Sequence, residues 1–175
     1  MKKHALILGA GFGGLELATR LHETLQQDLE VTLIDKSSFF ILGFSKFEVL
    51  FGRKRPDEIK SYYQNLSAAI RFRQEQIESI DPETRHVVTN PGSYDCDFLV
   101  VALGADLDPE ATPGLIEEGH EFYSLAGVER LSKVLPAFRS GKAMIAILGL
   151  PYKCPPAPFE AALQLHDYFE QNEIR

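Results

Sequence analysis

The sequence predicts an α/β fold whose first part is a parallel sheet, and three observations favour it. The apolar run His4–Gly9 lacks alternation of polar and apolar residues, which is typical of a parallel strand buried on both faces. A helix from about Gly13 to Gln27 follows, with apolar residues at helical spacing. Val31–Asp35 then reads as a second buried strand. Strand, helix and strand in this order predict a right-handed βαβ unit.

The segments after Asp35 predict a loop and then a meander of short strands. A long aromatic segment in a compact domain is usually functional rather than a simple connection. In chain order we expect a loop with some helix at Ser37–Arg55, a helix from Pro56 to about Ala69, strands at Ile70–Arg73, Gln76–Asp81 and His86–Thr89, and an apolar strand at Asp97–Leu103.

A linker rich in proline and acidic residues, Ala105–Gly119, predicts a domain boundary. We therefore expect one domain at residues 1–107 and an incomplete second domain at 108–175. The second domain should contain a helix at Leu125–Phe138, a buried strand at Lys142–Leu150 and a helix at Pro158–Gln171. Because a lone strand cannot satisfy its two hydrogen-bonding edges, either other chains pair with it or this is a fragment of a longer protein. We favour the fragment.

The composition excludes several classes of protein. The chain has 175 residues, 45% of them hydrophobic and 25% charged, which is ordinary for a globular protein. Its net charge of −7 argues against nucleic acid as a partner. Two cysteines and five scattered histidines give no metal-ligand spacing and too few thiols for a disulfide scaffold. With no apolar run long enough to span a bilayer, we expect a cytoplasmic protein without a metal.

The most informative motif is the glycine-rich run Gly9-Ala10-Gly11-Phe12-Gly13-Gly14, which matches G-x-G-x-x-G. It follows a predicted strand and opens a predicted helix, which is the context that dinucleotide binding requires. Gly9 permits a tight turn, Gly11 lets the backbone approach a pyrophosphate, and Gly14 lets the helix pack closely on the strand. The helix N-terminus, with Phe12 and Gly13, then faces the phosphates.

An acidic residue at the end of the second strand strengthens this interpretation. Asp35 lies about 20 residues beyond the third glycine, where the motif places an acid that accepts the ribose hydroxyls of an adenosine. An acid at this position argues against a 2′-phosphate, and we include the adjacent Lys36 among the cofactor-binding residues. The alternative is a glycine-rich turn that binds no ligand. We expect a Rossmann-like dinucleotide-binding domain.

The order of elements after Asp35 resembles the FAD domain of the pyridine nucleotide-disulfide oxidoreductase superfamily. Members of this superfamily carry an Ala-Thr-Gly-like triplet near the flavin dinucleotide, and this chain has Ala102-Leu103-Gly104. The resemblance implies FAD as cofactor, with Ala102 and Gly104 near it and Ile77 against the adenine. Ile77 has an equally good interpretation as a core isoleucine. The region from residue 108 would begin the second, truncated nucleotide-binding-like domain of the family.

A second motif resembles a narrower group within that superfamily. The run Lys153-Cys154-Pro155-Pro156-Ala157-Pro158-Phe159-Glu160 is similar to a segment of the flavocytochrome c sulfide dehydrogenases and the sulfide:quinone oxidoreductases. The resemblance implies a redox-active Cys154, whose thiolate is favoured by Lys153 and by a helix N-terminus. Glu160 would accept a proton. The alternatives are a small buried cysteine and a first-turn glutamate stabilised by the helix dipole.

The resemblance implies an FAD-dependent enzyme that passes electrons from sulfide, or another small sulfur substrate, to a quinone or a haem protein. Binding of NAD(P)H is not expected, because Gly149 is followed by prolines and bulky residues rather than further glycines. Cys96 matches no redox position of the family and reads as structural. We expect the fragment alone to be inactive and the intact protein to associate peripherally with a membrane. The alternatives are an NADH:quinone-type reductase of the same superfamily and a non-catalytic dinucleotide-binding module that self-associates through its unpaired strand.

Overall fold

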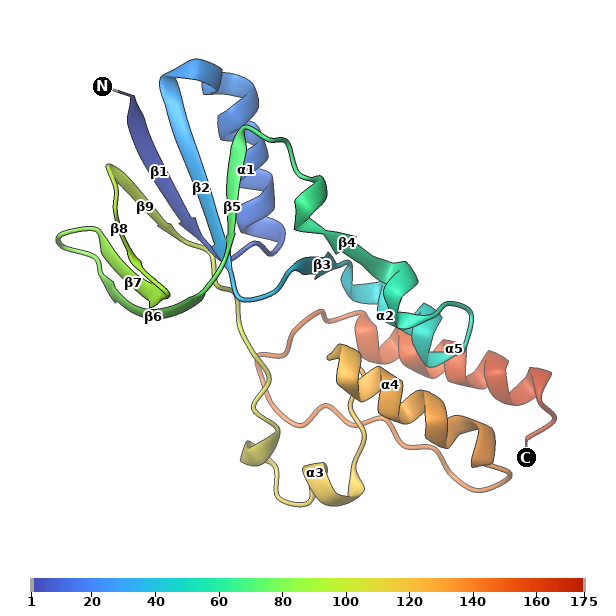
Figure 1. Ribbon diagram of the computed structural model, residues 1–175. Coiled ribbons are helices and arrows are strands. Elements are labelled where there is room, and N and C mark those ends of the chain that lie inside the picture. The colour runs from blue at the N-terminus through green and yellow to red at the C-terminus, as the bar shows by residue number, and fades with distance from the viewer. Residues whose placement is uncertain (1, 175) are drawn as a thin grey trace. The chain divides into compact units, whose positions relative to one another are not determined.

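A computed structural model describes residues 2–174, which form two compact units (Figure 1). The first unit contains the residues up to Phe40 together with Ser61–Asp106. The second contains Ile41–Lys60 and the residues from Leu107 onward. The chain therefore changes units near the predicted linker, and it also places the segment 41–60 in the second unit. The assignment of cofactor-binding and cysteine-bearing domains to 1–107 and 108–175 stays a prediction.

The first unit is built on a four-stranded parallel sheet in the order β5-β2-β1-β9. Its strands are β1 (Lys3–Leu8), β2 (Leu29–Asp35), β5 (Ile70–Gln74) and β9 (Phe98–Val101). In the register, Ala5 of β1 lies between Val31 of β2 and Phe98 of β9. The predicted α/β fold class with its parallel sheet and βαβ start is confirmed.

Both faces of this sheet are covered, as the unbroken apolar run in β1 predicts. Helix α1 (Phe12–Leu25) packs on one face, where its Ala18 belongs to the same buried cluster as Ala5 and Ile7. A 3₁₀ turn (Gln26–Asp28) follows α1. Leu6 and Leu8 point to the opposite face because side chains alternate along a strand, and there they form a second cluster.

The second cluster lies against a three-stranded antiparallel sheet, β6-β7-β8. These strands are β6 (Gln76–Asp81), β7 (His86–Asn90) and β8 (Ser93–Asp95). Val87 of β7 is fully buried against the parallel sheet. The predicted meander is therefore confirmed, although the short β8 is absent from the prediction, which has no strand between His86–Thr89 and Asp97–Leu103.

The helix predicted from Pro56 to Ala69 is wrong. The segment instead forms a 3₁₀ turn (Pro56–Ile59), strand β4 (Lys60–Tyr62) and a second 3₁₀ turn (Tyr63–Asn65). Strand β4 pairs with β3 (Phe39–Ile41) in a two-stranded sheet. Tertiary contacts override local helix propensity here, because extended backbone lets Tyr63 reach the core of the first unit.

The second unit is helical. Its α-helices are α2 (Lys46–Leu50), the short α3 (Leu115–Glu118), α4 (Leu125–Val134) and α5 (Ala157–Gln171). Short 3₁₀ turns precede α2 (Gly43–Ser45) and α3 (Pro109–Ala111), and another follows α4 (Leu135–Ala137). Phe47 of α2, Val128 of α4 and Ala161 of α5 share one buried apolar cluster. The helices predicted at Leu125–Phe138 and Pro158–Gln171 correspond to α4 and α5.

The buried strand predicted at Lys142–Leu150 is wrong. The segment has no regular structure, and Met144 and Leu150 are 89% and 83% exposed. A strand needs a neighbour to receive its backbone hydrogen bonds, and the sheets formed within residues 2–174 contain no partner for this segment. The apolar pattern therefore predicted a strand for which residues 2–174 supply no pairing partner.

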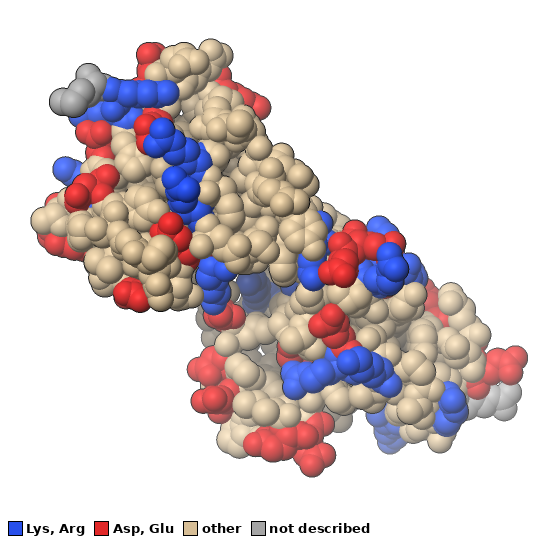
Figure 2. Space-filling model, viewed as in Figure 1, with Lys and Arg blue, Asp and Glu red and all other residues tan. Residues whose placement is uncertain are grey.

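Charged side chains of both signs are interspersed over the face of the molecule that Figure 2 shows. Within residues 2–174, no helix is both long and apolar enough to cross a membrane. The same residues contain no group of three or more His, Cys, Asp or Glu side chains placed to hold a metal ion.

Candidate functional site

The glycine-rich turn lies between β1 and α1, at the carboxyl end of the parallel strands. Gly9 has a φ of +96°, and a Cβ there would lie 2.4 Å from the carbonyl oxygen of Ala102. Its N–H donates to the carbonyl of Ile34 at 2.7 Å. Residue 9 must therefore be glycine for two reasons, since both its backbone conformation and its contact with the segment after β9 exclude a side chain.

Gly14 and Gly11 differ sharply in their surroundings. A Cβ on Gly14 would lie 1.8 Å from the carbonyl oxygen of Gly9, so its absence allows α1 to pack against the turn. A Cβ on Gly11 would meet no atom within 4 Å, and the same is true of Gly13. The fold therefore requires glycine at position 14, whereas at position 11 the missing side chain leaves open space.

This open space faces the start of a helix, which suits it to an anion. Gly11 is the N-cap of α1 and provides no side-chain cap, and the first turn of α1 contains no acidic residue. The first N–H groups of a helix have no partner within the helix and carry a partial positive charge. Backbone N–H groups beside open space, with no carboxylate in the turn, fit the pyrophosphate of a dinucleotide.

Asp35 binds the turn itself. Its Oδ2 accepts a hydrogen bond from the N–H of Ala10 at 2.7 Å, and its Oδ1 accepts from the N–H of Ser37 at 2.8 Å. Each carboxylate oxygen has a further lone pair, so these bonds leave acceptor capacity for a ribose hydroxyl. The predicted contact with ribose stays a prediction, and the structure adds a second role in bracing the glycine turn.

Tyr63 also holds the turn, and sequence reasoning missed it. Its hydroxyl donates to the carbonyl oxygen of Ala10 at 2.7 Å, and its ring lies 4.6 Å from the ring of Phe72. Burial, and then the negative charge of Asp35, raise the pKa of the Tyr63 phenol well above its ordinary value. The wrong prediction of a helix at 56–69 gave no reason to place Tyr63 beside Ala10, and no motif in the sequence indicates this hydrogen bond.

The other predicted cofactor residues occupy different surroundings within the first unit. The N–H of Ala102 donates to the carbonyl of Leu8 at 2.8 Å, directly beside the turn. Gly104 has a φ of +72°, which favours glycine. Phe12 is 64% exposed. Ile77 is partly buried against the second cluster of the sheet, and Lys36 lies on the surface.

Cys154 lies in the second unit, in the turn that precedes α5. The residue is exposed, and its φ of +55° is unusual for a side chain other than glycine. Its carbonyl accepts a hydrogen bond from the N–H of Ala157 at 2.9 Å, which closes the turn onto the helix. Glu160 is also exposed, and its Oε1 accepts from the side-chain amide of Gln164 at 2.5 Å.

A lysine and a tyrosine close to Cys154 were not predicted. The half-buried Lys46 donates a hydrogen bond to the carbonyl of Tyr123. Burial, and then the like charge of Lys153, lower the pKa of Lys46, while negative charge on Glu121 and on the Cys154 sulfur acts in the opposite direction. Burial, and then Cys154, raise the pKa of Tyr123. A cation and a phenol therefore share the electrostatic environment of this thiol.

Cys96 has different surroundings. It belongs to the first unit, is partly buried beside the second apolar cluster and donates from Sγ to the carbonyl of Arg85 at 3.4 Å. Burial raises the pKa of its thiol. Both cysteines are free thiols in the structure.

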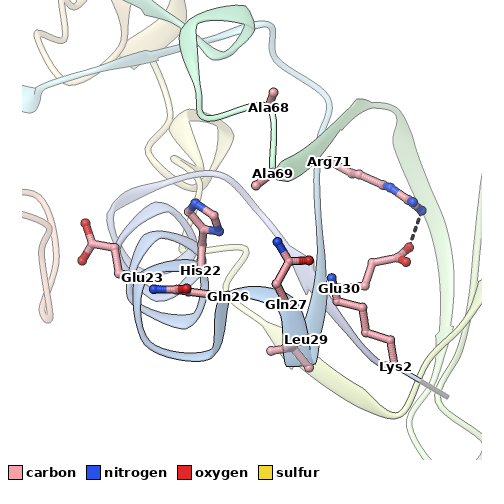
Figure 3. A pocket seen from close by; sticks show the side chains of 10 residues that line it. All are labelled: Lys2, His22, Glu23, Gln26, Gln27, Leu29, Glu30, Ala68, Ala69 and Arg71. Atoms are coloured by element: carbon pink, nitrogen blue, oxygen red, sulfur yellow. Dashed lines mark hydrogen bonds and ion pairs between the residues drawn. The ribbon is translucent and has the colours of Figure 1, made fainter.

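A hollow of about 570 Å³ lies in the first unit but away from these residues (Figure 3). Lys2, Leu29 and Ala69 place it at the amino ends of β1, β2 and β5, and His22 places it at the last turn of α1. An ion pair between Arg71 and Glu30 spans one side. Since the glycine turn lies at the opposite, carboxyl ends of the strands, where ligands of α/β sheets bind, this hollow is not part of the candidate dinucleotide site.

Comparison with known families decides what the glycine turn belongs to. Residues 3–149 match the family described as pyridine nucleotide-disulphide oxidoreductase, which is most of the chain. The chain belongs to this family. The family resemblance derived from the glycine turn and the order of elements is thereby confirmed. The match ends at Gly149, immediately before the proline-rich turn that carries Cys154.

Individual relatives fall into two groups. A type II NADH:quinone oxidoreductase from Staphylococcus aureus is 28% identical over 135 residues, which cover 75% of this chain and 34% of that protein. The structure of the sulfide:quinone oxidoreductase from Aquifex aeolicus has a TM-score of 0.83 and 25% identity, and covers 99% of this chain and 41% of that one. The chain thus spans about a third of the length of the curated relatives that it matches.

A more distant neighbour bears on the nicotinamide cofactor. The structure of NDH2 from Plasmodium falciparum in complex with NADH has a TM-score of 0.61 and 16% identity, over 76% of this chain and 28% of that one. At this identity the likeness shows the fold alone. The prediction that NAD(P)H does not bind receives no support from the comparisons, because family neighbours include proteins solved with NADH.

Proposed function

We propose that this chain is the FAD-binding part of an oxidoreductase that takes electrons from sulfide and delivers them to a quinone or a haem protein. The observation that carries the proposal is the likeness to the sulfide:quinone oxidoreductase, which covers 99% of the chain and therefore includes the turn around Cys154. The family match and the S. aureus relatives support only the coarser activity of the family.

FAD would be held by the first unit. The N–H groups of the Gly9–Gly14 turn would bind the pyrophosphate, and Asp35 would accept hydrogen bonds from the ribose. Ala102 and Gly104 would line the dinucleotide, with Lys36 beside the ribose and Ile77 near the adenine. When bound, FAD supplies a reversible acceptor for an electron pair.

Cys154 would provide the contact with sulfur. An exposed thiol can exchange with sulfur species, and Lys46 interacts electrostatically with this cysteine. Glu160 would accept the proton that sulfide or the thiol releases. Its exposed carboxylate lies in the first turn of α5, the helix that Cys154 precedes.

A second candidate is an NADH:quinone reductase, favoured by the S. aureus relatives. Against it stands the turn after Gly149, where Pro151, Pro155, Pro156 and bulky residues replace a glycine-rich sequence. Such a turn cannot bring three consecutive backbone segments against a pyrophosphate as the Gly9–Gly14 turn can.

The first test is retention of FAD by the 175-residue chain after desalting, read from flavin absorbance and fluorescence. The second distinguishes the two candidates in the intact protein. Under anaerobic conditions, sulfide should bleach the flavin of the wild type and of Cys96→Ser but not of Cys154→Ser. If NADH bleaches the flavin rapidly and Cys154→Ser responds to sulfide as the wild type does, the NADH:quinone reductase is the correct function.

A further inference from the structure

We propose that Tyr63 is a positioning residue for the dinucleotide turn: its hydroxyl fixes the Ala10–Gly11 peptide so that the Gly11 N–H faces the phosphate side. This inference rests on the proposed dinucleotide binding and deepens it. It concerns a residue outside the glycine motif, from a segment that reaches the turn only because residues 60–66 adopt extended and 3₁₀ conformations.

Both polar groups of Ala10 are held by side chains. Its carbonyl accepts a hydrogen bond from the Tyr63 hydroxyl, and its N–H donates to Oδ2 of Asp35, each at 2.7 Å. The two bonds fix two successive peptide planes, one on each side of the Ala10 Cα. Asp35 is expected from the motif to bind ribose, whereas nothing in the motif specifies a donor for the carbonyl.

Peptide geometry connects Tyr63 with Gly11. The Ala10–Gly11 bond is trans, so its carbonyl and its N–H point in opposite directions in one plane. Since the carbonyl points to the Tyr63 hydroxyl, the Gly11 N–H points away from it. A Cβ on Gly11 meets nothing within 4 Å, which shows that the space beside this residue is open. In the proposed complex, an oxygen of the pyrophosphate would accept a hydrogen bond from this N–H.

Tyr63 is itself held rigidly. It is 5% exposed, its ring packs on Phe72, and its own N–H donates to the carbonyl of Ser38 at 3.1 Å. A rigid donor matters because glycines flank Ala10 on both sides and give the turn more conformational freedom than other residues would. Fixing the peptide before the ligand arrives lowers the entropic cost of binding.

The test compares Tyr63→Phe with the wild type in binding ADP and adenosine, measured by NMR titration of the 175-residue chain. The variant keeps the ring and loses only the hydroxyl. Because the Gly11 N–H contacts phosphate and not the nucleoside, affinity for ADP should fall about five- to tenfold, the loss expected for one hydrogen bond. Affinity for adenosine should not change.

Tyr94→Phe is the matched control. It also removes a tyrosine hydroxyl in the first unit, one that donates to Oε1 of Glu75 at 2.7 Å and not to a backbone group of the turn. The control should leave the ratio of ADP affinity to adenosine affinity unchanged. An equal fall for both ligands in Tyr63→Phe, or no fall for ADP, would overturn the inference and leave dinucleotide binding intact.

A measurement on the wild type covers the case in which Tyr63→Phe does not fold. ADP should shift the amide signal of Gly11 strongly, and adenosine should shift it little. An unmoved Gly11 signal with bound ADP contradicts the inference alone. A wild type that binds neither ADP nor FAD contradicts the proposed function, and the inference falls with it.

Discussion

The glycines of the β1–α1 turn differ in whether the fold itself requires them. Gly9 and Gly14 are excluded from bearing side chains by atoms of the protein itself, the carbonyls of Ala102 and Gly9. A Cβ on Gly11 would meet no atom of the protein, so the fold itself does not require glycine there. A bound ligand would explain why this position lacks a side chain. Ala10 lies between Gly9 and Gly11 with both of its backbone groups held. Substitutions within this one motif should therefore have different effects, some on the stability of the fold and others on ligand binding.

Gly14→Ala should destabilise the first unit, and Gly11→Ala should weaken nucleotide binding. The added methyl at position 14 overlaps backbone, which costs about 1–3 kcal/mol or more of unfolding free energy. At position 11 the φ of −76° suits alanine, and the loss of an N-cap glycine costs below about 1 kcal/mol. Thermal denaturation and ADP titration of both variants check this. Full ADP affinity in Gly11→Ala would show that no ligand approaches this residue.

The two thiols should differ in reactivity towards Ellman's reagent. Cys154 is exposed, whereas Cys96 is partly buried and burial raises its pKa, which lowers the fraction of reactive thiolate at neutral pH. We expect labelling in two phases that differ in rate by about tenfold or more. Cys154→Ser should remove the fast phase and Cys96→Ser the slow one. Equal rates for the two single-cysteine variants would contradict this.

At the scale of elements, the sequence predicts best where a pattern is local. The apolar run of β1 and the glycines after it determine their own conformation, and both were predicted correctly. Tyr63 was not predicted, because its place depends on an acceptor more than fifty residues earlier in the chain. The apolar run at Lys142–Leu150 led to a wrong prediction of a strand. Its composition suits a strand, but a strand also needs a neighbouring strand to pair with.

The start of α4 offers a test of a local signal. The Oγ of Ser124, the N-cap residue, accepts a hydrogen bond from the N–H of Gly127 at 2.8 Å. Ser124→Ala should lower the unfolding free energy of the second unit by about 1 kcal/mol, since the helix loses its cap. Ser132→Ala, within the same helix, is the control and should be nearly neutral because alanine favours a helix interior. Urea denaturation followed by circular dichroism measures both, and equal effects would refute the cap.

The contact of Asp97, which precedes β9, with Lys3 and His4 of β1 should make the stability of the fold sensitive to acid. Hydrogen bonds from the side chain of Lys3 and then from the N–H of His4 hold the pKa of Asp97 below its ordinary value of 3.8. A carboxyl with a depressed folded-state pKa stabilises the fold above its ordinary pKa, and that contribution is lost as the pH falls through 3.8 and below. Asp97→Asn should therefore flatten the decline in urea midpoint below that pH.

Lys3→Gln provides the graded control for this acid response. It removes the ammonium, the largest cause of the shift, and keeps the hydrogen bond from the His4 N–H. Its dependence of urea midpoint on pH should lie between those of the wild type and Asp97→Asn. An acid decline in Asp97→Asn as steep as that of the wild type would show that other carboxyls dominate.

At the scale of the whole molecule, the buried apolar residues within positions 2–174 gather in three clusters, two on the faces of the sheet in the first unit and one in the second unit. The proline-rich linker signals the change of unit near residue 107, but no local pattern signals that segment 41–60 belongs with the later helices. The ring of Phe47 lies 5.8 Å from that of Phe122, and the ring of Phe51 lies 5.8 Å from that of Tyr168. Such pairings over long separations fix the membership of this segment.

Separate clusters predict that the two units unfold in separate steps. Val87 of the first unit and Val128 of the second are both fully buried, so either change to alanine should cost about 2 kcal/mol. ADP that binds the first unit should raise only the transition of that unit. We therefore expect Val87→Ala to lower the transition that responds to ADP in scanning calorimetry, and Val128→Ala to lower the other. If both variants shift one common transition that ADP also raises, the two clusters unfold as a single cooperative body.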